Sequence, residues 1–115
     1  MPLTLSASQS LALWHQVTVR VLQQSGPDLS ARQLAVLLTV YLNDEPHTVR
    51  GLAANLQVSK PAITRALDRL SDEGLLSRKT DDNDRRSVLI QKTPKGSTFL
   101  HDFGEAIRLA GENLT

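Results

Sequence analysis

The sequence contains no cysteine and very few aromatic residues. Without thiols the chain has no disulfide framework, no thiolate metal site and no thiol-based redox sensor. One Trp, one Tyr and two Phe make up 3% of the 115 residues, whereas hydrophobic residues in total make up 40%. A core with this composition is mostly aliphatic, and a chain of this length is most simply one small domain.

Long apolar runs are absent as well. No stretch reaches the roughly 18 apolar residues that a membrane-spanning helix needs. The segment Met1–Leu13 has no basic region followed by an unbroken apolar run, so it does not resemble a signal peptide. These absences predict a soluble, cytoplasmic protein with no membrane partner.

The motifs of common enzymes are also missing. The sequence has no phosphate-binding loop, no nucleophile elbow and no convincing acid–base pair. Acidic residues crowd together at 81, 82 and 84, but an exposed loop is a poor calcium site. The histidines are isolated from one another, and we expect surface or capping roles for His15, His47 and His101. The sequence therefore predicts no enzyme, no metal and no cofactor.

The charge is unevenly distributed along the chain, although the net charge is only +1. Residues 50–95 hold ten of the thirteen Lys and Arg but only six of the twelve Asp and Glu, which gives this window +4 and the remainder −3. A basic middle between mildly acidic ends is typical of a surface that binds a polyanion. The alternative is a solvated charged face on which basic residues cluster by chance.

One helical spacing of apolar residues occurs twice, fourteen positions apart. Apolar residues at i, i+3, i+4 and i+7 predict a short helix with one buried face. The segment 57–61 between the copies is too short for anything but a tight turn, so the two helices must cross sharply over one core. The copies are Val49, Leu52, Ala53 and Leu56, then Ile63, Ala66, Leu67 and Leu70. This pattern predicts a helix-turn-helix, whose second helix reads duplex DNA.

Hydroxyl residues mark the starts of the inner helices. Ser30, with Gln33 three residues later, has the spacing of a capping box for a central scaffold helix. Thr48 and Ser59 are the expected N-caps of the helix pair, and Pro61 suits a first helical turn.

Two longer helices are expected towards the ends of the chain, over 8–24 and from Thr93-Pro94 to 114. Each has a broad apolar side that requires neighbours. On the first helix this side is formed by Leu11, Trp14, Val17, Val21 and Leu22, and on the last by Phe99, Leu100, Phe103, Ala106, Ile107, Ala110 and Leu114.

A β-hairpin is expected between the helix pair and the last helix. The segments 76–80 and 86–92 have a strand-like pattern, and the tip at 81–85 is rich in the turn-forming residues Asp and Asn. The fold class is therefore mostly α with a small β-hairpin.

The outward side of the second paired helix is the strongest candidate for a binding site. Arg65 is suited to read guanine through two parallel hydrogen bonds. The outward set is Ser59, Lys60, Pro61, Thr64, Arg65, Asp68 and Asp72, of which Ser59, Lys60 and Thr64 suit phosphate or base-edge contacts. The alternative is that the charges only form surface pairs, Arg65 with Asp68 and Arg69 with Glu73.

The hairpin tip carries a second candidate group. Asp84, Arg85 and Arg86 follow one another at or just past the tip. The narrow minor groove of DNA has a strongly negative potential that attracts an inserted arginine. An aspartate two residues earlier could hold that guanidinium in place. The alternative is a charged loop that only keeps the chain soluble.

Together these segments resemble the MarR family of bacterial winged-helix regulators. The resemblance rests on residues 51–70, on Asp84-Arg85-Arg86, and on Thr93 and Gly96. It implies a winged helix-turn-helix fold, with recognition helix 60–73 in the major groove and wing 78–92 in the adjacent minor groove. Arg86 would then enter that groove with Asp84 as its partner. Lys92 departs from the family, which usually has an apolar residue there.

The resemblance also implies a homodimer on double-stranded DNA with a pseudo-palindromic operator. Within one winged-helix domain, 1–115, helices 8–24 and 94–114 would be the dimerisation helices and 30–93 the DNA-binding core. A small-molecule effector is a further implied partner, and His15, Arg20, Trp14 and Tyr41 are the residues that could line its cleft, although core or interface roles fit them better.

A protein-interaction module without specific DNA readout is the alternative function, because winged helices also serve as docking domains.

Overall fold

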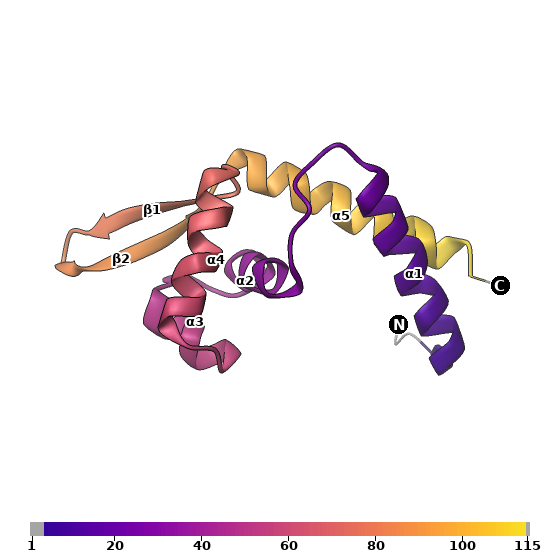
Figure 1. Cartoon of the computed structure of the whole chain (residues 1–115), viewed down its shortest axis with the longest axis horizontal. Coiled ribbons are helices and arrows are strands. Elements are labelled where there is room, and N and C mark those ends of the chain that lie inside the picture. The colour runs from indigo at the N-terminus through magenta and orange to yellow at the C-terminus, as the bar shows by residue number, and fades with distance from the viewer. Residues whose placement is uncertain (1–3, 115) are drawn as a thin grey trace. The chain divides into compact units, whose positions relative to one another are not determined.

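The computed structural model describes residues 4–114, so the start of the segment Met1–Leu13 and the last residue lie outside it. The described chain forms two compact units, one made of residues 29–98 and the other of the two terminal regions up to residue 28 and from residue 99 (Figure 1). No helix in residues 4–114 is both long enough and apolar enough to cross a membrane.

Three helices of the 29–98 unit begin at hydroxyl caps, as expected from the sequence. They are α2 (Ala31–Leu42), α3 (Val49–Leu56) and α4 (Lys60–Asp72). The Ser30 hydroxyl accepts the backbone N–H of Gln33 at 3.1 Å, and the Gln33 side chain accepts that of Ser30 at 2.9 Å, which completes the capping box. Thr48 and Ser59 cap α3 and α4 in the expected positions.

The core of this unit is aliphatic and centred on α4, which packs on α2, α3 and the first strand. The expected inner face of α4 is confirmed, and Ala62 is buried with it. On α3 the two middle residues of the expected stripe are buried, and the outer two are half-buried. The buried residues are Val36, Leu37, Val40, Leu52, Ala53, Ala62, Ile63, Ala66, Leu67, Leu70, Leu75, Leu76 and Ile90.

The hairpin is longer than the sequence predicts. Strand β1 (Leu76–Asp81) pairs antiparallel with β2 (Asp84–Lys92), and the tip is only two residues long. The expected tip at 81–85 is therefore wrong. Asp81 accepts the backbone N–H of Asn83 at 2.9 Å, so an aspartate side chain closes the turn in the absence of glycine.

The base of the hairpin is tied to α2 through one hydroxyl group. The Tyr41 hydroxyl accepts the backbone N–H of Thr93 at 3.0 Å and lies 3.2 Å from the carbonyl oxygen of Leu75. The Thr93 hydroxyl donates to the Gly74 carbonyl at 2.7 Å and accepts the N–H of Gly96 at 3.0 Å. These bonds join α2, both ends of the hairpin and the start of α5 (Pro94–Glu112).

Lys92, the departure from the family pattern, lies at this junction. Its ammonium group is 5.7 Å from the centre of the Tyr41 ring, within the range of a cation–π contact. The exposed Lys92 side chain thus covers a ring face that an apolar residue could also cover.

The other unit pairs α1 (Ala7–Gln23) with α5 from residue 99 onward. Helix α1 begins one residue earlier than expected, because the capping box is formed by Ser6 and Gln9. Of the expected apolar stripe of α1 only Val17 is buried, while Leu11 and Leu22 are 72% and 71% exposed and Trp14 is 50% exposed. One neighbouring helix leaves most of this broad apolar side uncovered, and the sequence predicts more than one neighbour for it.

On α5 the expected apolar side is covered in part. Phe103, Ala106 and Ala110 are buried, but Ile107 is 37% exposed and Leu114 lies beyond the end of the helix. Arg108, on the solvent side, bridges Glu105 at 2.8 Å and Glu112 at 2.6 Å. Its hydrogen bond holds the pKa of the Glu105 carboxyl below its usual value.

Gly96 is the residue whose replacement this packing tolerates least. A Cβ atom at this position would overlap the Tyr41 hydroxyl and the Leu75 carbonyl oxygen. We expect Gly96→Ala to lower the free energy of unfolding by about 2–3 kcal/mol, since a backbone carbonyl cannot move aside. Gly104→Ala is the matched control, because a Cβ there meets nothing within 4 Å and alanine favours helix by about 1 kcal/mol. Denaturant unfolding of both variants measures the difference, and equal stabilities would contradict the packing described here.

Candidate nucleic-acid interface

The turn between α3 and α4 sets the angle between these two helices. Gln57 adopts the left-handed conformation, with φ at 55°, and the N–H of Val58 bonds back to the Ala53 carbonyl at 3.1 Å. The chain therefore reverses within three residues, 57–59, and α4 begins immediately afterwards.

Helix α4 has an exposed polar face opposite the face that its core residues bury. Lys60, Pro61, Thr64 and Arg65 are all exposed, and so is the cap residue Ser59, whose hydroxyl accepts the backbone N–H of Ala62 at 3.3 Å. Because the opposite face of α4 is packed into the core, the helix holds these polar side chains in fixed positions.

Of the two surface pairs considered as the alternative for the charges on α4, only one is present. Asp68 binds Arg78 of β1 at 2.7 Å instead of pairing with Arg65. The other expected pair is present, with the Arg69 and Glu73 side chains 3.3 Å apart. Within residues 4–114 Arg65 forms no ion pair, so its guanidinium is available to an external partner. The Asp68–Arg78 contact also joins the hairpin to α4.

The hairpin arginines are exposed, but Asp84 has a different partner from the one expected. Its carboxylate accepts the backbone N–H of Arg86 at 3.1 Å and the hydroxyl of Ser87 at 3.3 Å. No ion pair between Asp84 and the Arg86 guanidinium is formed in the described chain. The short spacing lets the carboxylate reach the main chain first, so Asp84 shapes the strand after the turn and leaves the Arg85 and Arg86 side chains free.

Two arginines that were not predicted from the sequence lie beside α4. Arg50 lines a groove with Lys60 and Arg86, and Arg32 lines a separate groove with Arg65. A sequence signal for both exists. The first turns of α2, α3 and α4 contain no acidic residue and carry Arg32, Arg50 and Lys60 instead. Acids are the usual choice there because the amino end of a helix is partly positive.

The histidines fall into two groups. His15 and His101 are exposed, as expected, whereas His47 is only 7% exposed. The His47 ring nitrogen Nε2 lies 3.1 Å from the carbonyl oxygen of Asn43, the residue that caps the end of α2. His47 is therefore a buried capping residue and takes no part in the exposed polar face.

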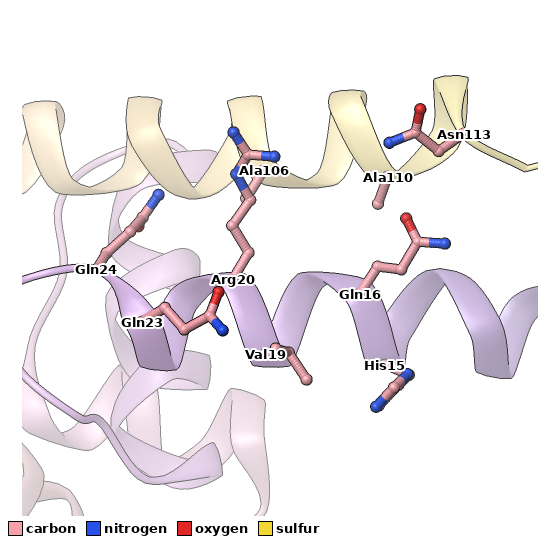
Figure 2. Close-up of a pocket in the computed structure, with 9 residues that line it drawn as sticks. All are labelled: His15, Gln16, Val19, Arg20, Gln23, Gln24, Ala106, Ala110 and Asn113. Atoms are coloured by element: carbon pink, nitrogen blue, oxygen red, sulfur yellow. The ribbon is translucent and has the colours of Figure 1, made fainter.

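Two of the four residues named for an effector cleft line one groove. His15 and Arg20 line a groove of about 540 Å³ between α1 and α5, and Figure 2 shows Arg20 reaching towards α5 near Ala106. Trp14 does not line this groove. Tyr41 belongs to the 29–98 unit, where its hydroxyl is occupied by the backbone of the hairpin. Binding of a small molecule in the groove stays a prediction.

The sharp helix pair followed by a two-stranded hairpin is that of a winged helix-turn-helix protein. A sequence model of the MarR family matches residues 29–88, which is more than half of the chain. The chain therefore belongs to the MarR family, a family of transcriptional regulators.

Two curated proteins are similar to parts of this chain. The HTH-type transcriptional regulator PecS of Dickeya dadantii is 33% identical over 75 residues, which are 64% of this chain and 45% of PecS. Riboflavin kinase of Thermococcus kodakarensis is 42% identical over 60 residues, 52% of this chain and 27% of the kinase. The chain thus spans less than half the length of these curated relatives. The MepR–DNA complex of S. aureus has a similar fold, with a TM-score of 0.70 and 20% identity over 89% of this chain and 78% of MepR.

The cap of α4 can be tested apart from any ligand. Ser59→Ala removes the acceptor for the Ala62 N–H, and we expect it to lower the free energy of unfolding by about 1 kcal/mol. Ser59→Asp keeps a good capping acceptor and should retain wild-type stability. Thermal or denaturant unfolding of the two variants gives the comparison. A Ser59→Ala protein as stable as the wild type would show that the cap contributes nothing.

Proposed function

We propose that this regulator binds duplex DNA sequence-specifically, with α4 in the major groove and the β1–β2 hairpin in the adjacent minor groove. The observation that carries the proposal is the exposed edge of α4, on which Lys60, Thr64 and Arg65 project from a helix whose opposite face is fully buried. A rigid helix with a polar outer edge can enter a major groove without rearranging its core.

The charges support this placement. Arg65 is free of intramolecular ion pairs in the described chain because Asp68 is bound by Arg78. A free guanidinium matches the two acceptors of guanine in the major groove, whereas a lysine such as Lys60 suits a phosphate as a point charge. Arg85 and Arg86 are exposed at the hairpin, where a narrow minor groove would attract them. The fold is also the one that MepR has in its complex with DNA.

Arg65 and Lys60 should differ in what their removal changes. Arg65→Ala should relax the base preference, with a loss of about 1–3 kcal/mol of discrimination at the position that it reads. Lys60→Ala should weaken binding to all duplexes alike and flatten the dependence of log K on log salt by about 0.9 for each phosphate that the variant no longer neutralises.

Selection of bound duplexes from a random pool, followed by titration of the selected and scrambled duplexes at several salt concentrations, measures both effects. Weak and equal binding of the wild type to every duplex would contradict specific readout. That result, together with co-purification of a heterologous protein and no retention on heparin, would favour the alternative of a protein-interaction module.

We further propose that two copies assemble through the α1–α5 unit on a pseudo-palindromic operator. Leu11 and Leu22 lie on the same side of α1 and are exposed, and Trp14 and Ile107 add to the uncovered apolar surface of this unit. Apolar side chains of this size in one small region are typical of a surface that another protein covers. A dimer would place two α4 helices on half-sites about 34–36 Å apart.

Leu11→Glu or Leu22→Glu should convert the dimer into monomers, because a carboxylate would be buried without a partner at the interface. Leu42→Glu is the matched control, since Leu42 is as exposed, at 77%, but belongs to the 29–98 unit. Light scattering behind size-exclusion chromatography reports the oligomeric state. Dissociation in the Leu42 variant but not in the α1 variants would place the interface elsewhere.

A further inference from the structure

A basic groove lies between the two parts of the chain that the proposed function places in DNA. Its walls come from the start of α3, the start of α4 and the β2 strand, and its volume is about 320 Å³. Each of these three elements contributes one basic side chain, Arg50, Lys60 and Arg86 respectively. The other lining residues are Thr48, Val49, Ser87 and Val88.

The groove carries positive charge and no compensating acid. None of its lining residues is acidic, and the ion pairs within residues 4–114 involve Arg69, Arg78 and Arg108 but none of the three basic residues of the groove. Three like charges around one hollow repel one another in the free protein. An anion in the groove would attract all three charges, and these attractions would oppose the repulsion among them.

The geometry of duplex DNA identifies the anion. A major groove and its neighbouring minor groove are separated by a single phosphodiester strand. If α4 occupies one groove and the hairpin the other, that strand must pass over the surface between Lys60 of α4 and Arg86 of β2. The basic groove is on that surface, because both residues line it.

We propose that this groove binds a backbone phosphate of the strand between the major and minor grooves, and that Arg50 is the residue that holds it. The inference rests on the proposed function and adds a third element, α3, to the DNA interface. Arg50 is exposed and lies two residues after the cap residue Thr48. The Thr48 hydroxyl already accepts the N–H of Gly51 at 3.0 Å, so this oxygen is engaged in capping the helix. The guanidinium of Arg50 therefore supplies the contact, through hydrogen bonds to the phosphate oxygens.

A salt titration of the full chain on its selected duplex tests the role of Arg50. Arg50→Gln should reduce the slope of log K against log salt by about 0.9 for each bound protomer, and weaken binding about tenfold or more, with no change in base preference. Arg50→Lys should keep the slope of the wild type, because a phosphate accepts a point charge. Arg108→Gln is the control, since it removes the same charge from an exposed position on α5 where Glu105 and Glu112 already bind the side chain.

Phosphate replacement locates the contact on the DNA. Neutral methylphosphonate groups are placed one at a time along the strand between the base selected by Arg65 and the minor-groove position affected by Arg86. One of these replacements should weaken binding by the wild type about as much as Arg50→Gln weakens binding to the unmodified duplex. The same replacement should not weaken binding by the Arg50→Gln protein any further.

The outcomes separate this inference from the proposed function. A wild type with a steep salt slope and an Arg50→Gln variant identical to Arg108→Gln would overturn the phosphate site and leave the proposed function in place. A change of base preference in Arg50→Gln would assign the residue to base reading and also overturn it. A wild type that binds no duplex specifically would remove the proposed function, and the inference with it.

Discussion

The position of the hairpin depends above all on the half-buried contact between the Tyr41 hydroxyl and the backbone of Thr93. This bond, with the neighbouring bonds of the Thr93 side chain, fixes the start of β1 and the end of β2 against α2 and the first turn of α5. Gly96 is required because α5 passes so close to the hydroxyl that no side chain fits. Farther out, Arg78 and Asp68 connect β1 to α4. An exposed ion pair contributes little free energy, about 0–1 kcal/mol, so the half-buried junction contributes more than the ion pair to the position of the hairpin beside α4.

Buried and exposed residues are divided cleanly along α4. Its small and aliphatic residues all face the core, and α2, α3 and β1 hold it from several sides. The exposed residues Lys60, Thr64 and Arg65 can therefore be chosen for what they bind, because none of them is needed for packing. Such preorganisation reduces the conformational entropy that an interface loses on binding. The same logic applies to Asp84, which bonds to backbone and neighbouring hydroxyl and leaves the side chains of Arg85 and Arg86 unpaired.

The parts of this protein that follow from local rules could be predicted from its sequence. The caps Ser30, Thr48 and Ser59, the inner face of α4 and the existence of the hairpin all depend on spacing over a few residues, and all are confirmed. The sequence does not predict the partner of a side chain when that partner is distant in sequence, or when a main-chain group competes with a side chain for the same bond. The pairing of Asp68 with Arg78, ten residues away, was not predicted, and Asp84 bonds to an amide where a guanidinium was expected. The spacing of apolar residues on α1 predicts a broad apolar side, but it cannot tell a surface covered within the chain from one that is left uncovered.

The first turns of α2, α3 and α4 show how a binding requirement can oppose local stability. Each begins with a hydroxyl cap, which stabilises the helix, and then carries a basic residue where the partial positive charge of the helix end favours an acid. An exposed cation in that position costs roughly 0.3–1 kcal/mol in each helix. The caps offset that cost within the same turn, so the free protein stays folded while Arg32, Arg50 and Lys60 keep their charges unpaired in the described chain. In the proposed complex with DNA, positive helix ends and basic side chains would act together on the phosphate backbone, and the unfavourable arrangement of the free protein would become a favourable one.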